Sequence, residues 1–199
     1  MTQVRGLRFV TCAGLMALAG FCGSVHAASD FSVKTEKRGD EVLVEARATL
    51  AVSLAVIWRT LTDYNSFPGF ISGMSKSRLV EYRNTAAIVE QVGEAGFLIF
   101  SLPIDVTVES LELPPHVIEV RLLKGNLKKL DGRYEIEEGA TPADPIVLRW
   151  SGTVEPEKPL PALVGELVMR RSVTRQFRDM VDEIERRSVQ AAGAPGHAK

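Results

Sequence analysis

Two hydrophobic periods divide the chain. Over residues 42–50, 130–136 and 146–154, alternate positions are mainly apolar, with charged or small polar residues between them. This period of two predicts strands with one buried face, as in an antiparallel sheet. Over 54–61, and again beyond residue 160, apolar residues recur every three or four positions. That spacing predicts amphipathic helices, so the chain is expected to form an α+β domain.

Turn-forming residues separate the predicted strands. Arg38-Gly39-Asp40 is typical of a hairpin turn, and Gly96, Pro114-Pro115 and Gly125-Asn126 are expected to break later strands. The predicted strands are Phe31–Lys37, Glu41–Leu50, Ser75–Tyr82, Ala86–Val92, Phe97–Leu111, Val117–Lys124, Lys128–Glu137 and Ile146–Val154.

The helical segments differ in length. Ser53 is a predicted N-cap for a short helix that ends near Asp63-Tyr64, and 67–71 then predicts a second helical turn. A much longer helix is expected over Pro161–Ser188, since proline suits the first helical turn. At 1.5 Å per residue it extends about 40 Å. A curved antiparallel sheet around this long C-terminal helix buries all the apolar faces together.

The two ends of the chain carry other signals. Arg5 and Arg8, an apolar run over 9–21 and the small-x-small sequence Val25-His26-Ala27 predict an export signal over 1–27, cleaved before Ala28. An uncleaved anchor is the alternative. A lipid anchor on Cys22 is disfavoured because the large Phe21 precedes it. The domain is then 28–189, and the Ala- and Gly-containing tail 190–199 is expected to be disordered. Such a leader predicts a periplasmic or secreted protein.

Composition narrows the chemistry. The chain has 24 basic and 25 acidic residues; the leader holds two of the basic and none of the acidic, so the remainder has a net charge of −3. This balance gives no basic footprint for nucleic acid. Both cysteines lie in the leader, and of the remaining histidines His197 lies in the tail and His116 in a turn. We therefore expect no metal, no cofactor and no catalytic residue.

Several motifs carry a family resemblance. Trp58, then 61–64 (LTDY), then 67–70 (FPGF), resemble the opening of the polyketide cyclase/dehydrase and lipid transport family, of the START-like SRPBCC superfamily. The segments 113–116 (LPPH) and 127–134 (LKKLDGRY) are similar to the branch that includes the coenzyme Q-binding START domain. The resemblance covers about 42–187 and implies a helix-grip fold. A strand over 31–37 is an addition to that pattern.

The resemblance implies an enclosed cavity for a hydrophobic small molecule, with 67–74 as its lid. The residues expected to contact this ligand are Phe70, Phe100, Tyr134, Leu148, Trp150, Leu163, Leu167 and Phe177. The expected function is an exported carrier of a lipid or isoprenoid-like molecule, with transient membrane contact allowed and no oligomeric state indicated. Two alternatives stay open: a cyclase/dehydrase-type enzyme using the same cavity, and an interaction module with a filled core.

Overall fold

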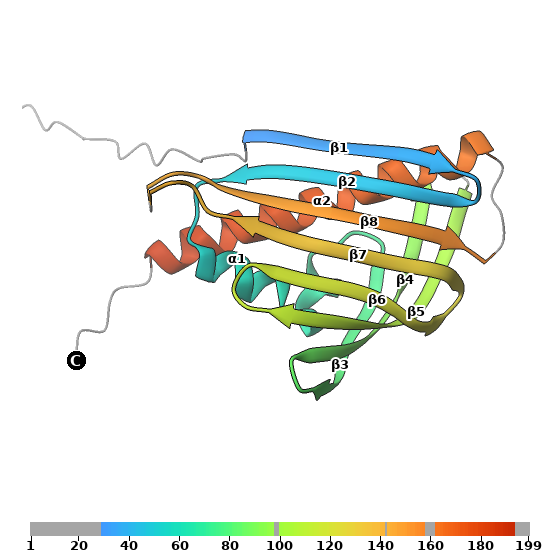
Figure 1. The fold of residues 1–199 in the computed structure, drawn as a ribbon, viewed down its shortest axis with the longest axis horizontal. Helices are drawn as coiled ribbons and strands as arrows, with labels where there is room; N and C mark the ends of the chain where they lie inside the picture. The colour runs from blue at the N-terminus through green and yellow to red at the C-terminus, as the bar shows by residue number, and fades with distance from the viewer. Residues whose placement is uncertain (1–28, 98–99, 142, 158–161, 194–199) are drawn as a thin grey trace, which may run out of the picture.

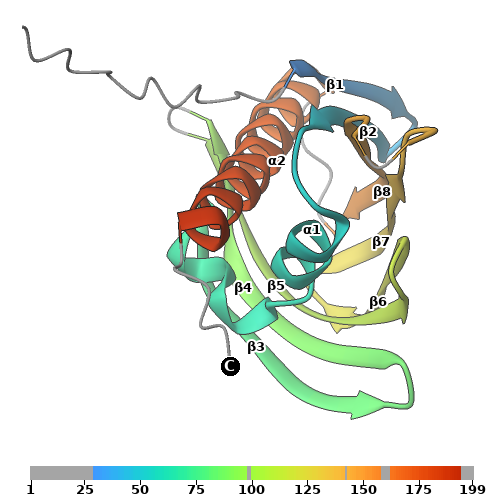
Figure 2. The same ribbon diagram turned by 90° about the vertical axis from the view of Figure 1, so that its left-hand side faces the viewer.

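The computed structural model describes residues 29–97, 100–141, 143–157 and 162–193. These form an eight-stranded antiparallel sheet that curves round a long helix (Figures 1 and 2). The strands are β1 (Ser29–Arg38), β2 (Glu41–Leu50), β3 (Met74–Arg83), β4 (Ala86–Phe97), β5 (Phe100–Leu113), β6 (Val117–Gly125), β7 (Leu127–Glu137) and β8 (Ile146–Pro156). The helices are α1 (Leu54–Leu61), the 3-10 helix η1 (Tyr64–Gly69) and α2 (Ala162–Gly193).

The strand order places the two ends of the domain side by side. In the order β1-β2-β8-β7-β6-β5-β4-β3, each strand from β3 to β8 pairs with its neighbour in sequence, and β2 pairs with β8. The connection from β2 to the far edge strand β3 contains α1 and η1. Figure 2 shows α1 on the concave side of the sheet, the side on which α2 also lies.

Helix α2 fills the inside of the curve. Its 32 residues correspond to about 48 Å of helix, enough to cross the sheet. Towards its C-terminal end, Val181 and Ile184 are fully buried and join one core with Leu50, Ile57 and Leu148 from β2, α1 and β8. This end of the domain is therefore closely packed, as the apolar stripe of the helix predicts.

The α+β helix-grip fold predicted from the sequence is confirmed, with the strand boundary near Gly96 to correct. Gly96 was expected to separate two strands, but β4 continues through it to Phe97 and pairs with β5. The backbone of Gly96 is also held from α2: its N–H donates to the hydroxyl of Ser172 at 3.0 Å, and its carbonyl accepts from Arg175 at 3.2 Å. Tertiary contacts thus override the local preference of a glycine to end a strand.

The predicted ends of the chain lie mostly outside the described residues. The leader over 1–27 does so entirely. Helix α2 continues to Gly193, so the first four residues of the predicted tail, 190–193, are helical.

Candidate ligand cavity

A cavity of about 240 Å³ lies between the inner face of the sheet, helix α2 and the segment that follows α1. Its lining is mainly aliphatic and aromatic. The sheet contributes residues from β2, β4, β5, β6, β7 and β8, including Val92, Ile104, Val106, Val108, Ile118, Val120, Leu130 and Val154. Helix α2 contributes Met169, Val173, Phe177 and Met180. The space is therefore suited to an apolar molecule.

An indole ring and two glycines shape the sheet wall. Gly132 on β7 is paired directly with Gly152 on β8, and Tyr134 is paired with Trp150. A Cβ on Gly132 would lie 1.9 Å from the ring of Trp150. The glycine thus makes room for the indole to lie against the sheet. Tyr134 packs beside it, with 4.5 Å between ring centroids, so the two aromatic rings form one continuous wall.

The segment after α1 closes another side of the cavity. Phe67, Ile71 and Met74 line it. The C-terminal end of the segment is bound to two elements: the Ser72 N–H donates to Asp179 on α2 at 2.7 Å, and the carbonyl of Gly73 accepts from the Glu94 N–H on β4 at 2.7 Å. The predicted lid therefore borders the cavity and is anchored to helix and sheet.

Helix α2 is supported from behind by the edge strand β1. The ring of Phe31 lies 5.6 Å from that of Phe177, which lines the cavity. The guanidinium of Arg178 lies 4.1 Å above the Phe31 ring, a cation–π contact. The added strand thus backs one wall of the cavity.

Polar groups lie at a few places in this lining. Tyr64 from η1 donates to Glu112 at 2.9 Å, and its neighbour in the lining is the buried Ser110. Burial, followed by the charge of Glu112, raises the pKa of Tyr64. Burial raises the pKa of Tyr134 to about 12. Both phenols therefore stay protonated, and so uncharged, at neutral pH.

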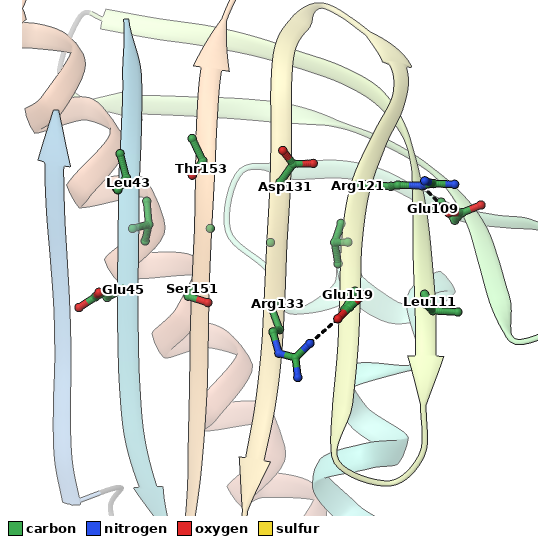
Figure 3. A pocket seen from close by; sticks show the side chains of 14 residues that line it. Leu43, Glu45, Glu109, Leu111, Glu119, Arg121, Asp131, Arg133, Ser151 and Thr153 are labelled. Carbon is green, nitrogen blue, oxygen red and sulfur yellow. Dashed lines mark hydrogen bonds and ion pairs between the residues drawn. The ribbon is translucent and has the colours of Figure 1, made fainter. Parts of the chain in front are cut away.

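A larger hollow, about 620 Å³, lies on the outer face of the same sheet (Figure 3). Its borders are charged: Arg121 on β6 bonds Glu109 on β5 at 2.5 Å, and Arg133 on β7 bonds Glu119 on β6. Figure 3 shows these side chains above strands, with α2 behind the sheet. No described element covers this hollow. An open, polar surface buries little of an apolar ligand, so the smaller inner cavity is the better ligand site.

Three of the eight predicted ligand-contacting residues line the inner cavity: Tyr134, Trp150 and Phe177. Leu148 is fully buried in the core and does not border the cavity. Phe70 packs edge-to-face on Phe67, which does line it, with 5.7 Å between the ring centroids.

The other three predicted contacts lie on α2 and at the start of β5. Leu167 is half-buried on α2 and is not among the lining residues. The side chains of Phe100 and Leu163 lie outside the described part of the structure. The ligand-contacting role of all eight residues stays a prediction.

Two buried serines in the lining were missed in the sequence. Ser110 continues the inward positions of Val106 and Val108 on β5, and Ser172 faces β4 from α2. The sequence did carry a signal for Ser110, because it is a small polar residue in line with the apolar Val106 and Val108 on β5.

Across the described ranges no group of three or more His, Cys, Asp or Glu could hold a metal ion. None of the described helices is long and apolar enough to cross a membrane.

The chain is similar to known proteins in sequence and in fold. Residues 41–189 match the sequence profile of a family described as polyketide cyclase/dehydrase and lipid transport; the match begins after β1. No curated protein matches the sequence.

Solved structures share the fold at low identity. The Zhui aromatase/cyclase from Streptomyces sp. R1128 is 15% identical, with a TM-score of 0.63 over 79% of this chain and 99% of that chain. A START superfamily protein from Mycobacterium smegmatis is 15% identical, with a TM-score of 0.57 over 75% and 98%. A STAR-related lipid transfer protein from Xanthomonas axonopodis is 12% identical, with a TM-score of 0.54 over 77% and 98%.

Proposed function

Because the chain belongs to the polyketide cyclase/dehydrase and lipid transport family, we propose that it is an exported carrier that encloses a hydrophobic small molecule, lipid- or isoprenoid-like. The observation that carries this proposal is the cavity between sheet and helix, bordered by apolar side chains on every element that faces it. A STAR-related lipid transfer protein with the same fold is consistent with it. The resemblance to the coenzyme Q-binding branch stays a prediction.

The size of the cavity sets the size of the ligand. Its volume of about 240 Å³ exceeds the ~150 Å³ of an apolar cavity that binds benzene, and is below the ~300–1,000 Å³ typical of drug-sized sites. A single short chain or a small ring system therefore fits without expansion. Affinity would come from burial, at about 0.8 kcal/mol for each methylene removed from water.

The same cavity argues for binding rather than turnover. A cyclase/dehydrase-type enzyme needs a group that exchanges protons near neutral pH. Among the described lining residues the phenols of Tyr64 and Tyr134 have raised pKa values, and the one carboxylate, that of Glu94, belongs to an exposed residue. An interaction module with a filled core is disfavoured by the cavity itself. We therefore favour the carrier.

Export and ligand occupancy are testable in one preparation. The full chain, leader included, is expressed in a Gram-negative host and purified from the periplasm. Native mass spectrometry is expected to give a chain that begins at Ala28 together with a bound small molecule, which denaturation releases. A chain that retains Met1, or that carries lipid on Cys22, contradicts export by the predicted route. Mature protein that neither carries a small molecule nor takes up a fluorescent lipid contradicts the carrier.

A further inference from the structure

Two glutamine residues line the ligand cavity. Gln91 lies on β4 and pairs with Val106, another lining residue, so both face the inside of the sheet. Gln176 lies on α2. Both glutamines are half-buried, and no hydrogen bond joins either side-chain amide to another described residue. The cavity wall therefore carries two amides whose donors and acceptors are unused.

The contacts of α2 show which way Gln176 faces. It lies one helical turn after Ser172, whose hydroxyl accepts from the Gly96 N–H on β4. It lies about one turn before Asp179, whose carboxylate accepts from the Ser72 N–H. Residues spaced in this way share one stripe of a helix. Gln176 therefore faces the place where β4 meets the segment that closes the cavity.

Gln91 approaches the same place from the sheet. It is two residues before Gly93 on one face of β4, and Gly93 pairs with Met74 at the end of the closing segment. Gln91 itself pairs with Ser77 on β3, which is 8% exposed and whose Oγ has no hydrogen-bond partner in the described structure. Buried polar groups without a partner are costly. A ligand that supplies the missing hydrogen bonds at this corner therefore gains affinity.

The charges around the cavity restrict the ligand further. None of the described lining residues is a lysine, arginine or histidine. A ligand carboxylate would thus lose its hydration without gaining a cation. The one lining carboxylate, that of Glu94, belongs to an exposed residue with an interaction of its own, so an ammonium group would have to compete for it. A neutral head group loses less hydration, and an amide can both donate to it and accept from it.

We propose that Gln91 and Gln176 bind the head group of the carried ligand, and that this ligand is an uncharged amphiphile whose head both donates and accepts hydrogen bonds. This inference rests on the proposed carrier function and names its ligand class. The apolar chain of the ligand lies along the aliphatic wall of β5, formed by Ile104, Val106 and Val108.

The test uses four probes with the same eight-carbon chain: octane, octanamide, octanoate and octylammonium. Their dissociation constants are measured by displacement of a fluorescent hydrophobe from the purified protein. For the wild type we expect octanamide to bind about tenfold more tightly than either charged probe. Gln91→Leu and Gln176→Leu keep the side-chain size but remove the amide. Each should weaken the binding of octanamide about five- to tenfold and leave that of octane unchanged.

A gain of binding tests the same site in the opposite direction. Gln91→Lys places a cation on the cavity wall, and the two cross-strand partners of residue 91, Ser77 and Val106, are uncharged. Octanoate should then bind about tenfold more tightly than it binds the wild type. Misfolding cannot produce such a gain, so this variant complements the two leucine substitutions.

Gln190 provides the matched control, because it is an exposed glutamine of α2 that does not line the cavity. Gln190→Leu and Gln190→Lys should leave all four dissociation constants unchanged. Octanoate binding the wild type as tightly as octanamide does, or substitutions of Gln91 and Gln176 that act no differently from those of Gln190, would overturn the assignment and leave the carrier intact. Failure of all four probes to bind the wild type counts against the carrier itself.

Discussion

The inner and outer faces of the sheet are built from alternate residues of the same strands, yet the two faces differ in polarity and in how far they are covered. On β7 Tyr134 lines the inner cavity and a Cβ on Gly132 would meet the Trp150 ring, while Asp131 and Arg133 line the outer hollow. The inner face is covered by α2 and η1 and holds a small apolar cavity. The outer face is open and carries cross-strand ion pairs round a larger hollow (Figure 3).

Coverage and polarity, rather than volume, distinguish the inner cavity as the candidate ligand site. The outer hollow is more than twice as large as the inner cavity, at about 620 against 240 Å³, but no described element closes it. Opposite charges on neighbouring strands stabilise such a surface by roughly 0.2–1 kcal/mol per pair while leaving it hydrated. Removing apolar surface from water requires the enclosed inner face.

The largest effect should follow from adding one methyl group to the inner face. Gly132→Ala places a Cβ against the Trp150 ring, which must move into the cavity. We expect a loss of about 2–3 kcal/mol in the free energy of unfolding, together with loss of ligand uptake. Urea titration, monitored by tryptophan fluorescence, measures the free energy of unfolding. On the outer face, Ser151→Ala is the control, since Ser151 is exposed, and it should change neither quantity. Equal effects of the two variants would remove the distinction between the faces.

A smaller effect is expected from the buried carboxylate of Glu183, which pairs with two arginines of the same helix, α2. Glu183, 7% exposed, accepts from Arg186 and Arg187 at 2.6 Å, and Arg187 also contacts Asp63 at 2.9 Å. Glu183→Gln should cost about 1.5 kcal/mol at neutral pH. The unfolding free energy is measured by urea titration.

The pH dependence of this contribution has a defined sign. The hydrogen bond from Arg186, more than any other cause, lowers the pKa of Glu183 in the folded state. Its contribution is therefore present above the unfolded carboxyl pKa of about 4.3 and is lost as pH falls through the lower folded value. The stability of Glu183→Gln should accordingly fall less in acid than that of the wild type. Parallel acid titrations of the two proteins would contradict this role.

The smallest effect should come from the ion pairs of the outer face. Arg133 contacts Glu119 and Glu135, and all three side chains are substantially exposed. Arg133→Ala should lower the unfolding free energy by less than about 1 kcal/mol, because solvent screens such pairs. Ligand uptake should not change. A loss of uptake in this variant would show that the outer hollow takes part in binding.

The fold was predictable because its main signals are local. Apolar residues alternate along β7 and β8 and form a long stripe on α2. These patterns predict a curved sheet packed around a helix, and the structure confirms it. The boundary at Gly96 was not predictable in this way. Its backbone is bound by Ser172 and Arg175, which lie 76 and 79 residues later in the chain.

The cavity was only partly predictable. Alternation identifies Tyr134, Trp150 and Leu148 as inward, but it does not separate residues that border empty space from those that are closely packed. Leu148 is in the packed core and Trp150 at the cavity, although they are two residues apart on one face of β8. That distinction depends on where α2 and η1 approach the sheet, which no strand pattern encodes.

The central claim, that the inner face holds an empty ligand site rather than a filled core, is tested most directly by one paired measurement. Val120 on β6 is half-buried and lines the cavity, whereas Val89 on β4 is fully buried in the packed core outside it. Melting temperature and uptake of a fluorescent lipid are measured for Val120→Phe and Val89→Phe. We predict that Val120→Phe loses uptake with little change in melting temperature, while Val89→Phe is destabilised by about 1–3 kcal/mol through overpacking. Equal destabilisation by both substitutions, with no uptake by the wild type, would contradict the account and leave a protein with a filled core.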